Sequence, residues 1–152
     1  MSTPYKTFSY HTFGCKVNFA DSAFIARELV KEGYSQIPIE SDADICLINT
    51  CSVTNNADKK AEKMIKNIHK QFPETKIIVY GCYAQLNPEK ISNLKGVAIV
   101  VGTENKFNIN KIISKKRLSK KSYNTDIDNV NKFDISYSLN ERTRAFIKIQ
   151  DG

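Results

Sequence analysis

Short apolar runs alternate with amphipathic stretches along most of the chain, and this alternation constrains the fold more than any other feature of the sequence. Apolar or β-branched runs at residues 5–11, 44–49, 76–80 and 97–101 predict four strands. Apolar residues recur at helical spacing after each run, which predicts helices over about 19–33, 57–72, 88–94 and 105–118. Strands that alternate with helices predict a parallel sheet with crossover helices on its faces.

The predicted class is α/β, a parallel sheet of about four strands with crossover helices in the layering of flavodoxin or Rossmann folds, plus a C-terminal arm. Asn18 or Asp21 is placed to cap the first helix, and Gly33 to end it. From 119 to 141 the composition shifts to Lys, Asn, Ser and Asp, which predicts a linker. Residues 144–150 alternate as a strand does but have no following helix or partner. Because the sequence stops at Gly152, we expect a truncated chain.

Charge and hydropathy limit the function classes. The 152 residues carry 23 Lys and Arg against 16 Asp and Glu, a formal charge of +7, which favours a polyanionic partner such as nucleic acid. No run approaches the roughly eighteen apolar residues of a membrane helix, and residues 1–6 lack the pattern of a secretory signal. We therefore expect a cytoplasmic protein with no membrane partner. The sequence contains no glycine motif for a dinucleotide or for ATP phosphates.

Three of the four cysteines follow successive predicted strands. Cys15, Cys51 and Cys82 lie in turns beside glycine or small polar residues, and Cys51 is expected to be an exposed thiolate. Because the carboxyl ends of parallel strands meet at one sheet edge, the three thiols should converge there. Helix N-termini at that edge favour the thiolate form. Cys46 instead lies inside an apolar run, which is typical of a buried core residue.

Three soft thiolates suit an iron-sulfur cluster, zinc or copper, and three protein ligands leave one coordination position open for chemistry. A zinc site with a fourth ligand is an alternative, and His11 is the candidate. A histidine on a strand is, however, more often packed or hydrogen-bonded than a ligand. His69, late in the second helix, is expected to face solvent.

Polar and basic residues near the cysteines have two interpretations each. Four side chains can hydrogen-bond cluster sulfurs, but Asn and Thr in such turns equally form Asx-turns and caps. These are Asn18, Asn49, Thr50 and Asn55. Four lysines of the second predicted helix are expected to form a solvated face. These are Lys59, Lys60, Lys63 and Lys66. The basic segment 115–121 is more typical of a solvated linker than of a nucleic-acid contact.

Several motifs, in order, resemble the N-terminal domain of the radical S-adenosylmethionine methylthiotransferases. They lie at residues 13–18 (Phe-Gly-Cys-Lys-Val-Asn), 48–54 with 58–60 downstream, 79–85 and 100–103. Gly-Cys-Lys-x-Asn and Gly-Cys-Tyr-Ala-Gln most resemble the tRNA threonylcarbamoyladenosine branch, whereas the isopentenyladenosine branch typically has Gln after the first cysteine. The resemblance covers residues 5 to about 110, and residues 142–152 are similar to the start of the family's radical barrel.

The resemblance implies that Cys15, Cys51 and Cys82 ligate an auxiliary 4Fe-4S cluster whose open iron is implicated in sulfur delivery. It implies a cluster-binding domain at 1–118, a variable basic linker at 119–141 and the first strand of the barrel at 142–152. The full-length enzyme would bind a radical 4Fe-4S cluster and S-adenosylmethionine, and would add a 2-methylthio group to N6-threonylcarbamoyladenosine next to the anticodon of tRNA.

The rest of the barrel and the family's C-terminal RNA-binding domain do not occur in this sequence. No catalytic residue is therefore expected in the chain, which alone should be inactive. Two alternatives remain, an RNA- or protein-binding α/β module with bystander cysteines and a structural zinc domain.

Overall fold

The computed structural model describes residues 6–14, 16–51, 55–102, 108–114, 121–123, 136–138 and 146–148. Cys15, the side chain of Asn55 and most of residues 115–152 lie outside this part of the chain. The elements in chain order are β1 (Thr7–Thr12), α1 (Lys16–Lys31), β2 (Ser35–Gln36), β3 (Ile45–Thr50), α2 (Asn55–Gln71), β4 (Lys76–Gly81), α3 (Cys82–Leu86), α4 (Pro88–Ser92), β5 (Val97–Val101), α5 (Ile109–Ser114), β6 (Lys121–Tyr123), β7 (Ser136–Ser138) and β8 (Phe146–Lys148).

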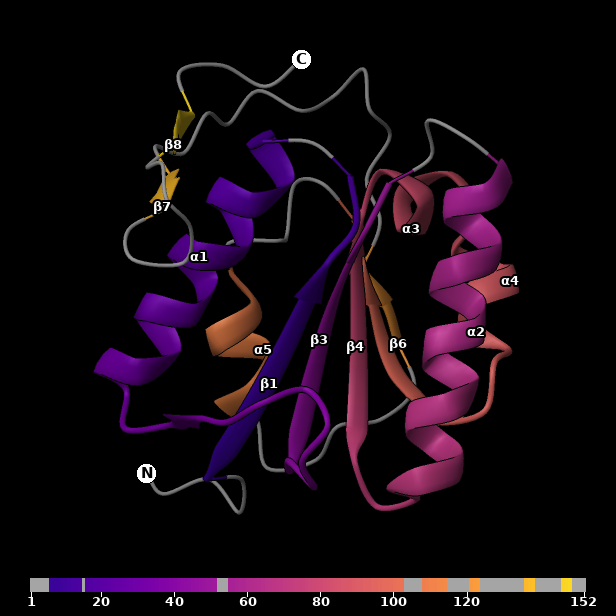
Figure 1. The fold of residues 1–152 in the computed structure, drawn as a ribbon, viewed down its shortest axis with the longest axis horizontal. Helices are drawn as coiled ribbons and strands as arrows, with labels where there is room; N and C mark the ends of the chain where they lie inside the picture. The colour runs from indigo at the N-terminus through magenta and orange to yellow at the C-terminus, as the bar shows by residue number, and fades with distance from the viewer. Residues whose placement is uncertain are drawn as a thin grey trace.

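A parallel sheet lies between two layers of helices, as Figure 1 shows. Its strands run in the order β2-β1-β3-β4-β5-β6, and every neighbouring pair is parallel. The four predicted strands are β1, β3, β4 and β5, which confirms the α/β class with crossover helices. The sheet is wider than predicted because the short strands β2 and β6 extend its two edges.

The central strands are apolar on both faces because helices cover both. All six residues of β3 are buried, as expected for a central strand of a parallel sheet. Ile45 and Leu47 belong to the core under α1 and α5, whereas Cys46 and Ile48 belong to the core under α2, α3 and α4. Cys46 is 1% exposed, which confirms its interpretation as a core residue.

Several element boundaries differ from the sequence-based expectation. α1 begins at Lys16, so Asn18 and Asp21 lie inside the helix and are buried, and the prediction that one of them caps it is wrong. A short helix, α3, begins at Cys82 where only a turn was predicted. The predicted strand near the C-terminus includes β8, which has an antiparallel partner in β7.

The strands direct their carboxyl ends to one side of the molecule, where α1 and α2 begin (Figure 1). Parallel α/β sheets bind their ligands at this edge. In the part of the chain that the structure describes, no helix has the length and hydropathy needed to cross a membrane.

Candidate metal centre at the carboxyl edge of the sheet

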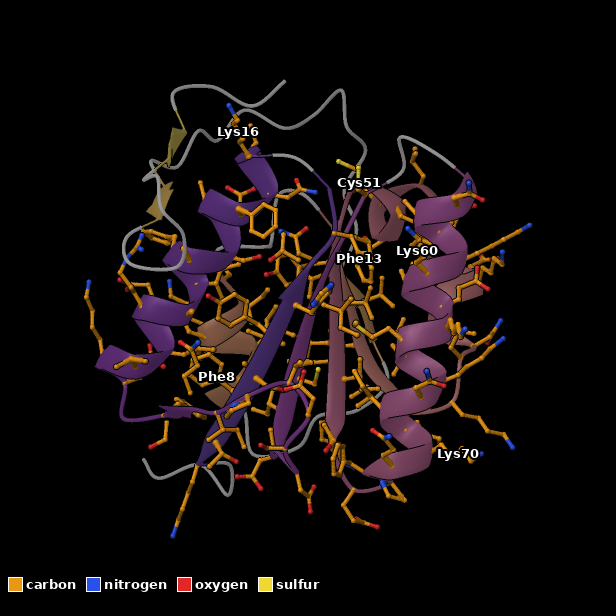
Figure 2. All side chains as sticks on the ribbon, in the orientation of Figure 1. Phe8, Phe13, Lys16, Cys51, Lys60 and Lys70 are labelled. Carbon is orange, nitrogen blue, oxygen red and sulfur yellow. The ribbon has the colours of Figure 1, made fainter. Side chains whose placement is uncertain are left out.

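The carboxyl ends of β1, β3 and β4 lie side by side. β1 pairs with β3, and β3 with β4, up to their last residues. Gly14 follows β1, Cys51 follows β3, and Cys82 follows Gly81 at the end of β4. We call this end of the sheet, at Gly14, Cys51 and Gly81–Cys82, the cysteine edge. Figure 2 shows Cys51 there, at the same end of the molecule as Phe13 and Lys16.

Gly14 lies directly against the side chain of Cys51. A Cβ built on Gly14 would lie 2.7 Å from the Cβ of Cys51 and 3.0 Å from its Sγ, closer than a side chain could approach. Gly14 also has a φ of +109°, which only glycine adopts without strain. The residue before Cys15 therefore touches the second cysteine, although Cys15 itself lies outside the described residues.

Cys51 is buried and Cys82 is exposed. The prediction that Cys51 is an exposed thiolate is therefore wrong, since the residue is only 6% exposed. The physical reason is that the backbone at Gly14 packs against the Cys51 side chain. Cys82 keeps the solvent access that its place at the start of α3 allows.

Gly81 permits a second close approach at the same edge. Its φ is +103°, and a Cβ there would overlap the carbonyl oxygen of Thr50 and lie 2.5 Å from Oδ1 of Asn49. Glycine is thus the residue that lets the last turn of β4 pass against the end of β3. Cys82 begins α3 immediately after this contact.

Asn18 and Thr50 direct their polar groups to the backbone of the cysteine edge. Nδ2 of Asn18 donates to the carbonyl of Phe13 at 2.9 Å and to that of Thr50 at 3.4 Å. The Thr50 hydroxyl donates to the carbonyl of Tyr80 at 2.8 Å and accepts from the Ala84 amide at 3.2 Å. These side chains therefore bind backbone groups of the cysteine turns.

A buried polar network lies beneath the edge, on the α1 side. Asn49 Nδ2 donates to the carbonyl of Asn18 at 2.9 Å and to the Ser22 hydroxyl at 3.1 Å, and Thr12 donates to Ser22 at 2.7 Å. The Ser22 and Tyr80 hydroxyls are 2.9 Å apart. Buried polar groups need such partners because losing water costs free energy.

Sequence reasoning did not predict the roles of Thr12, Ser22 and Tyr80. The sequence signals these roles only weakly. Thr12 and Tyr80 carry hydroxyls near strand ends, and Ser22 carries one in the second turn of α1, at positions where a buried residue is usually apolar. Asn49 Oδ1, next to Gly81, is buried and has no hydrogen-bond partner among the described residues.

The two histidines are packing residues. His11 stacks edge-on against Phe13 with ring centroids 4.6 Å apart, which confirms the packed interpretation. Burial lowers the pKa of His11, and the charge of Glu40 opposes this shift. The prediction that His69 faces solvent holds only in part: the residue is half-buried, and its Nδ1 is buried against Gly96 and has no partner within the described part of the chain.

Cys46 is unsuited to be a ligand of this edge. Burial raises the pKa of its thiol to about 11, and a hydrogen bond with Ser9 opposes that shift only in part. Cys46 also lies inside β3, four residues before its last residue Thr50, in the core beneath α2 and not at the cysteine edge. The four predicted lysines, by contrast, are exposed on α2 as expected. The basic segment 115–121 lies almost wholly outside the described residues.

The donor chemistry of the edge fits a thiolate-bound metal group. No three His, Cys, Asp or Glu side chains form a metal site within the described residues, which include Cys51 and Cys82 but not Cys15. The close approach of Gly14 to the Cys51 sulfur nevertheless joins the first cysteine turn to the second. Sulfur ligands of this kind favour iron-sulfur clusters or zinc.

The fold and the edge define a class, the α/β domain with cysteine turns at the carboxyl edge of a parallel sheet. Residues 7–102 match the family described as "Uncharacterized protein family UPF0004". The chain belongs to this family, which is the N-terminal domain of methylthiotransferases. The resemblance seen in the sequence is thereby confirmed.

Named relatives agree with this membership. The chain is 38% identical to the threonylcarbamoyladenosine tRNA methylthiotransferase MtaB of Bacillus subtilis, over 96% of the chain and 33% of that relative. It is 35% identical to the MtaB of Thermotoga maritima, over 97% of the chain and 33% of that relative. It is 32% identical to the tRNA-2-methylthio-N(6)-dimethylallyladenosine synthase of Ruegeria pomeroyi, over 100% of the chain and 36% of that relative. The chain thus spans about a third of the length of these curated relatives.

Proposed function

We propose that the chain is the N-terminal part of a tRNA methylthiotransferase and that its cysteine edge holds the auxiliary 4Fe-4S cluster. The observation that carries the proposal is the contact of Gly14 with Cys51, because it joins two cysteine turns that are far apart in the sequence. The family membership supports the same assignment.

Each residue of the edge has a role in this proposal. Cys15, Cys51 and Cys82 supply thiolate ligands, and three ligands leave one iron without a protein ligand. When bound, the cluster supplies an iron position that can carry sulfur. Burial of Cys51 keeps water from one ligand, whereas the exposed Cys82 leaves the edge open on the α3 side. Asn18, Asn49 and Thr50 hold backbone groups beside these ligands.

The proposed reaction belongs to the whole protein. We propose that the full-length enzyme adds a 2-methylthio group to N6-threonylcarbamoyladenosine next to the anticodon of a tRNA. It would use a radical 4Fe-4S cluster and S-adenosylmethionine on a barrel domain, together with a C-terminal RNA-binding domain, in the cytoplasm. The 152-residue chain contains no Cys-x-x-x-Cys-x-x-Cys motif for the radical cluster, so by itself it would not complete the reaction.

The substrate branch is supported by relatives and by one motif. Four relatives named for threonylcarbamoyladenosine are 32–38% identical to the chain, and four named for dimethylallyladenosine are 30–34% identical, so the two ranges overlap and the higher identities belong to the first group. Lys16 after the first cysteine also favours the threonylcarbamoyladenosine branch. Nucleoside mass spectrometry of tRNA from a host that lacks both activities and expresses the full-length enzyme tests this. A methylthio group on dimethylallyladenosine, and none on threonylcarbamoyladenosine, would reassign the branch.

Metal analysis tests the cluster. After anaerobic purification, we expect about four iron and four sulfide per chain. Zinc without sulfide would instead support the structural zinc domain. A reduced chain with neither metal after reconstitution would support the binding module with bystander cysteines.

A further inference from the structure

One side chain in the first turns of α1 connects two cysteine turns. The Asn18 amide Nδ2 carries two hydrogens, and it donates to the carbonyl of Phe13, before Cys15, and to that of Thr50, before Cys51. Both acceptors are main-chain groups, and Asn18 is only 7% exposed. The amide orientation is fixed by chemistry, since carbonyl oxygens can only accept.

A second side chain connects the middle cysteine turn to the third. The fully buried Thr50 donates its single hydroxyl hydrogen to the carbonyl of Tyr80 and accepts from the Ala84 amide. These two main-chain groups lie on either side of Cys82. Since that hydrogen is already donated, the hydroxyl has none left to give to a sulfur.

We infer that Asn18 and Thr50 are positioning residues that hold the three cysteine turns in one arrangement before any metal group binds. The chain of contacts runs from Phe13 through Asn18 to Thr50, and from Thr50 to Tyr80 and Ala84. Fixing loops costs conformational entropy, and a site that is ordered in advance loses less of it on binding. The inference rests on the proposed function for the identity of the metal group only.

Thr50 offers a clean test because the chain contains a matched control. Thr75 is also buried, and its hydroxyl donates to the carbonyl of Ala43 at 2.7 Å, at the opposite end of the same strands. Thr50→Val and Thr75→Val are nearly isosteric changes, and each removes a buried hydroxyl bonded to a carbonyl. Thr50→Ser keeps the hydroxyl at the edge and serves as the rescue variant.

The first readout is iron release from the reconstituted 152-residue chain to a chelator, with unfolding free energies measured in parallel. Thr50→Val should release iron about threefold to tenfold faster, the range of one or two hydrogen bonds. Thr75→Val and Thr50→Ser should stay within about twofold of the natural chain. Equal release from the two valine variants would show that only global stability matters and would overturn the inference.

The second readout needs no metal, so it separates this inference from the proposed function. In the reduced, metal-free chain, iodoacetamide should modify Cys51 about threefold to tenfold faster in Thr50→Val than in Thr75→Val. A chain that binds no iron would defeat the proposed cluster, and this comparison would still decide the positioning role. Equal Cys51 rates in the two variants would overturn it.

A third measurement covers the case in which Thr50→Val does not fold. Asn18→Ala then takes its place in both readouts, with the same control. In the unaltered chain, the Ala84 amide should also exchange its hydrogen slowly, because it donates to the Thr50 hydroxyl. Exchange of that amide at the rate of an unprotected loop would contradict the inference.

Discussion

Replacing Gly14 by Ala should damage the cysteine edge more than an ordinary glycine substitution does. The new Cβ would lie 2.7 Å from both Asn18 Nδ2 and the Cβ of Cys51, on a backbone with a φ of +109°. Two separate costs follow, the strain of a left-handed backbone and the displacement of packed neighbours. Gly33→Ala is the matched control, because Gly33 has a φ of +97° and nothing within 4 Å of its built Cβ.

The expected difference can be worked from these contacts. Backbone strain alone costs about 1–3 kcal/mol in either variant. Overpacking adds about 1–3 kcal/mol at Gly14 only. Gly14→Ala should therefore lower the free energy of unfolding by about 2–6 kcal/mol, and Gly33→Ala by about 1–3 kcal/mol.

Urea unfolding of the reduced, metal-free chain measures both variants under the same conditions. Iodoacetamide labelling of Cys51 in native buffer then shows whether the loss lies at the edge, since a displaced Cys51 should react faster in Gly14→Ala than in Gly33→Ala. If the two variants lose the same stability and label Cys51 equally, the close approach of Gly14 to Cys51 is not a constraint and the reasoning fails.

Three further predictions concern single groups. Burial lowers the pKa of His11 from 6.5, so the unfolded state binds more protons than the folded state just below pH 6.5. The free energy of unfolding should therefore fall as the pH drops from 6.5 towards the lowered pKa. His11→Gln should flatten this pH dependence in urea titrations, and an unchanged pH dependence would refute the prediction. Tyr80→Phe removes one of the hydrogen-bond partners of the Ser22 hydroxyl, which also accepts from Thr12 and Asn49. It should lower the free energy of unfolding by about 1 kcal/mol in a thermal melt, and an unchanged melt would mean that this bond contributes nothing. Cys46 is 1% exposed and its thiol pKa is about 11, so it should resist iodoacetamide under native conditions while the exposed Cys82 reacts. Equal labelling of the two cysteines in peptide mass spectra would contradict the placement of Cys46 in the core.

The layers of the fold could be predicted because the central strands are apolar at nearly every position. Ile45 to Ile48 form such a run in β3, and a run of this kind between helical patterns is typical of a parallel sheet covered on both faces. The edge strand β2 could not be predicted in the same way. It has two residues, both exposed, so it carries no hydrophobic period.

The cysteine edge could be predicted only in outline. Sequence position places Cys51 and Cys82 after strand ends, and topology places those ends together. Burial of Cys51 depends on contact with Gly14, which comes from a different turn and leaves no local signal. The expectation that Asn18 caps α1 failed because its side chain bonds to carbonyls of two separate turns, a tertiary contact that spacing alone does not reveal.

Iron and sulfide content of four single variants, each reconstituted anaerobically, tests the central claim most directly. We expect Cys46→Ala to keep about four iron and four sulfide per chain, because Cys46 lies in the core beneath α2. Cys15→Ala, Cys51→Ala and Cys82→Ala should each lose most of both while the domain stays folded by circular dichroism. Full iron and sulfide in any one of those three folded variants would contradict the assignment of that cysteine as a ligand and, with it, the three-thiolate cluster.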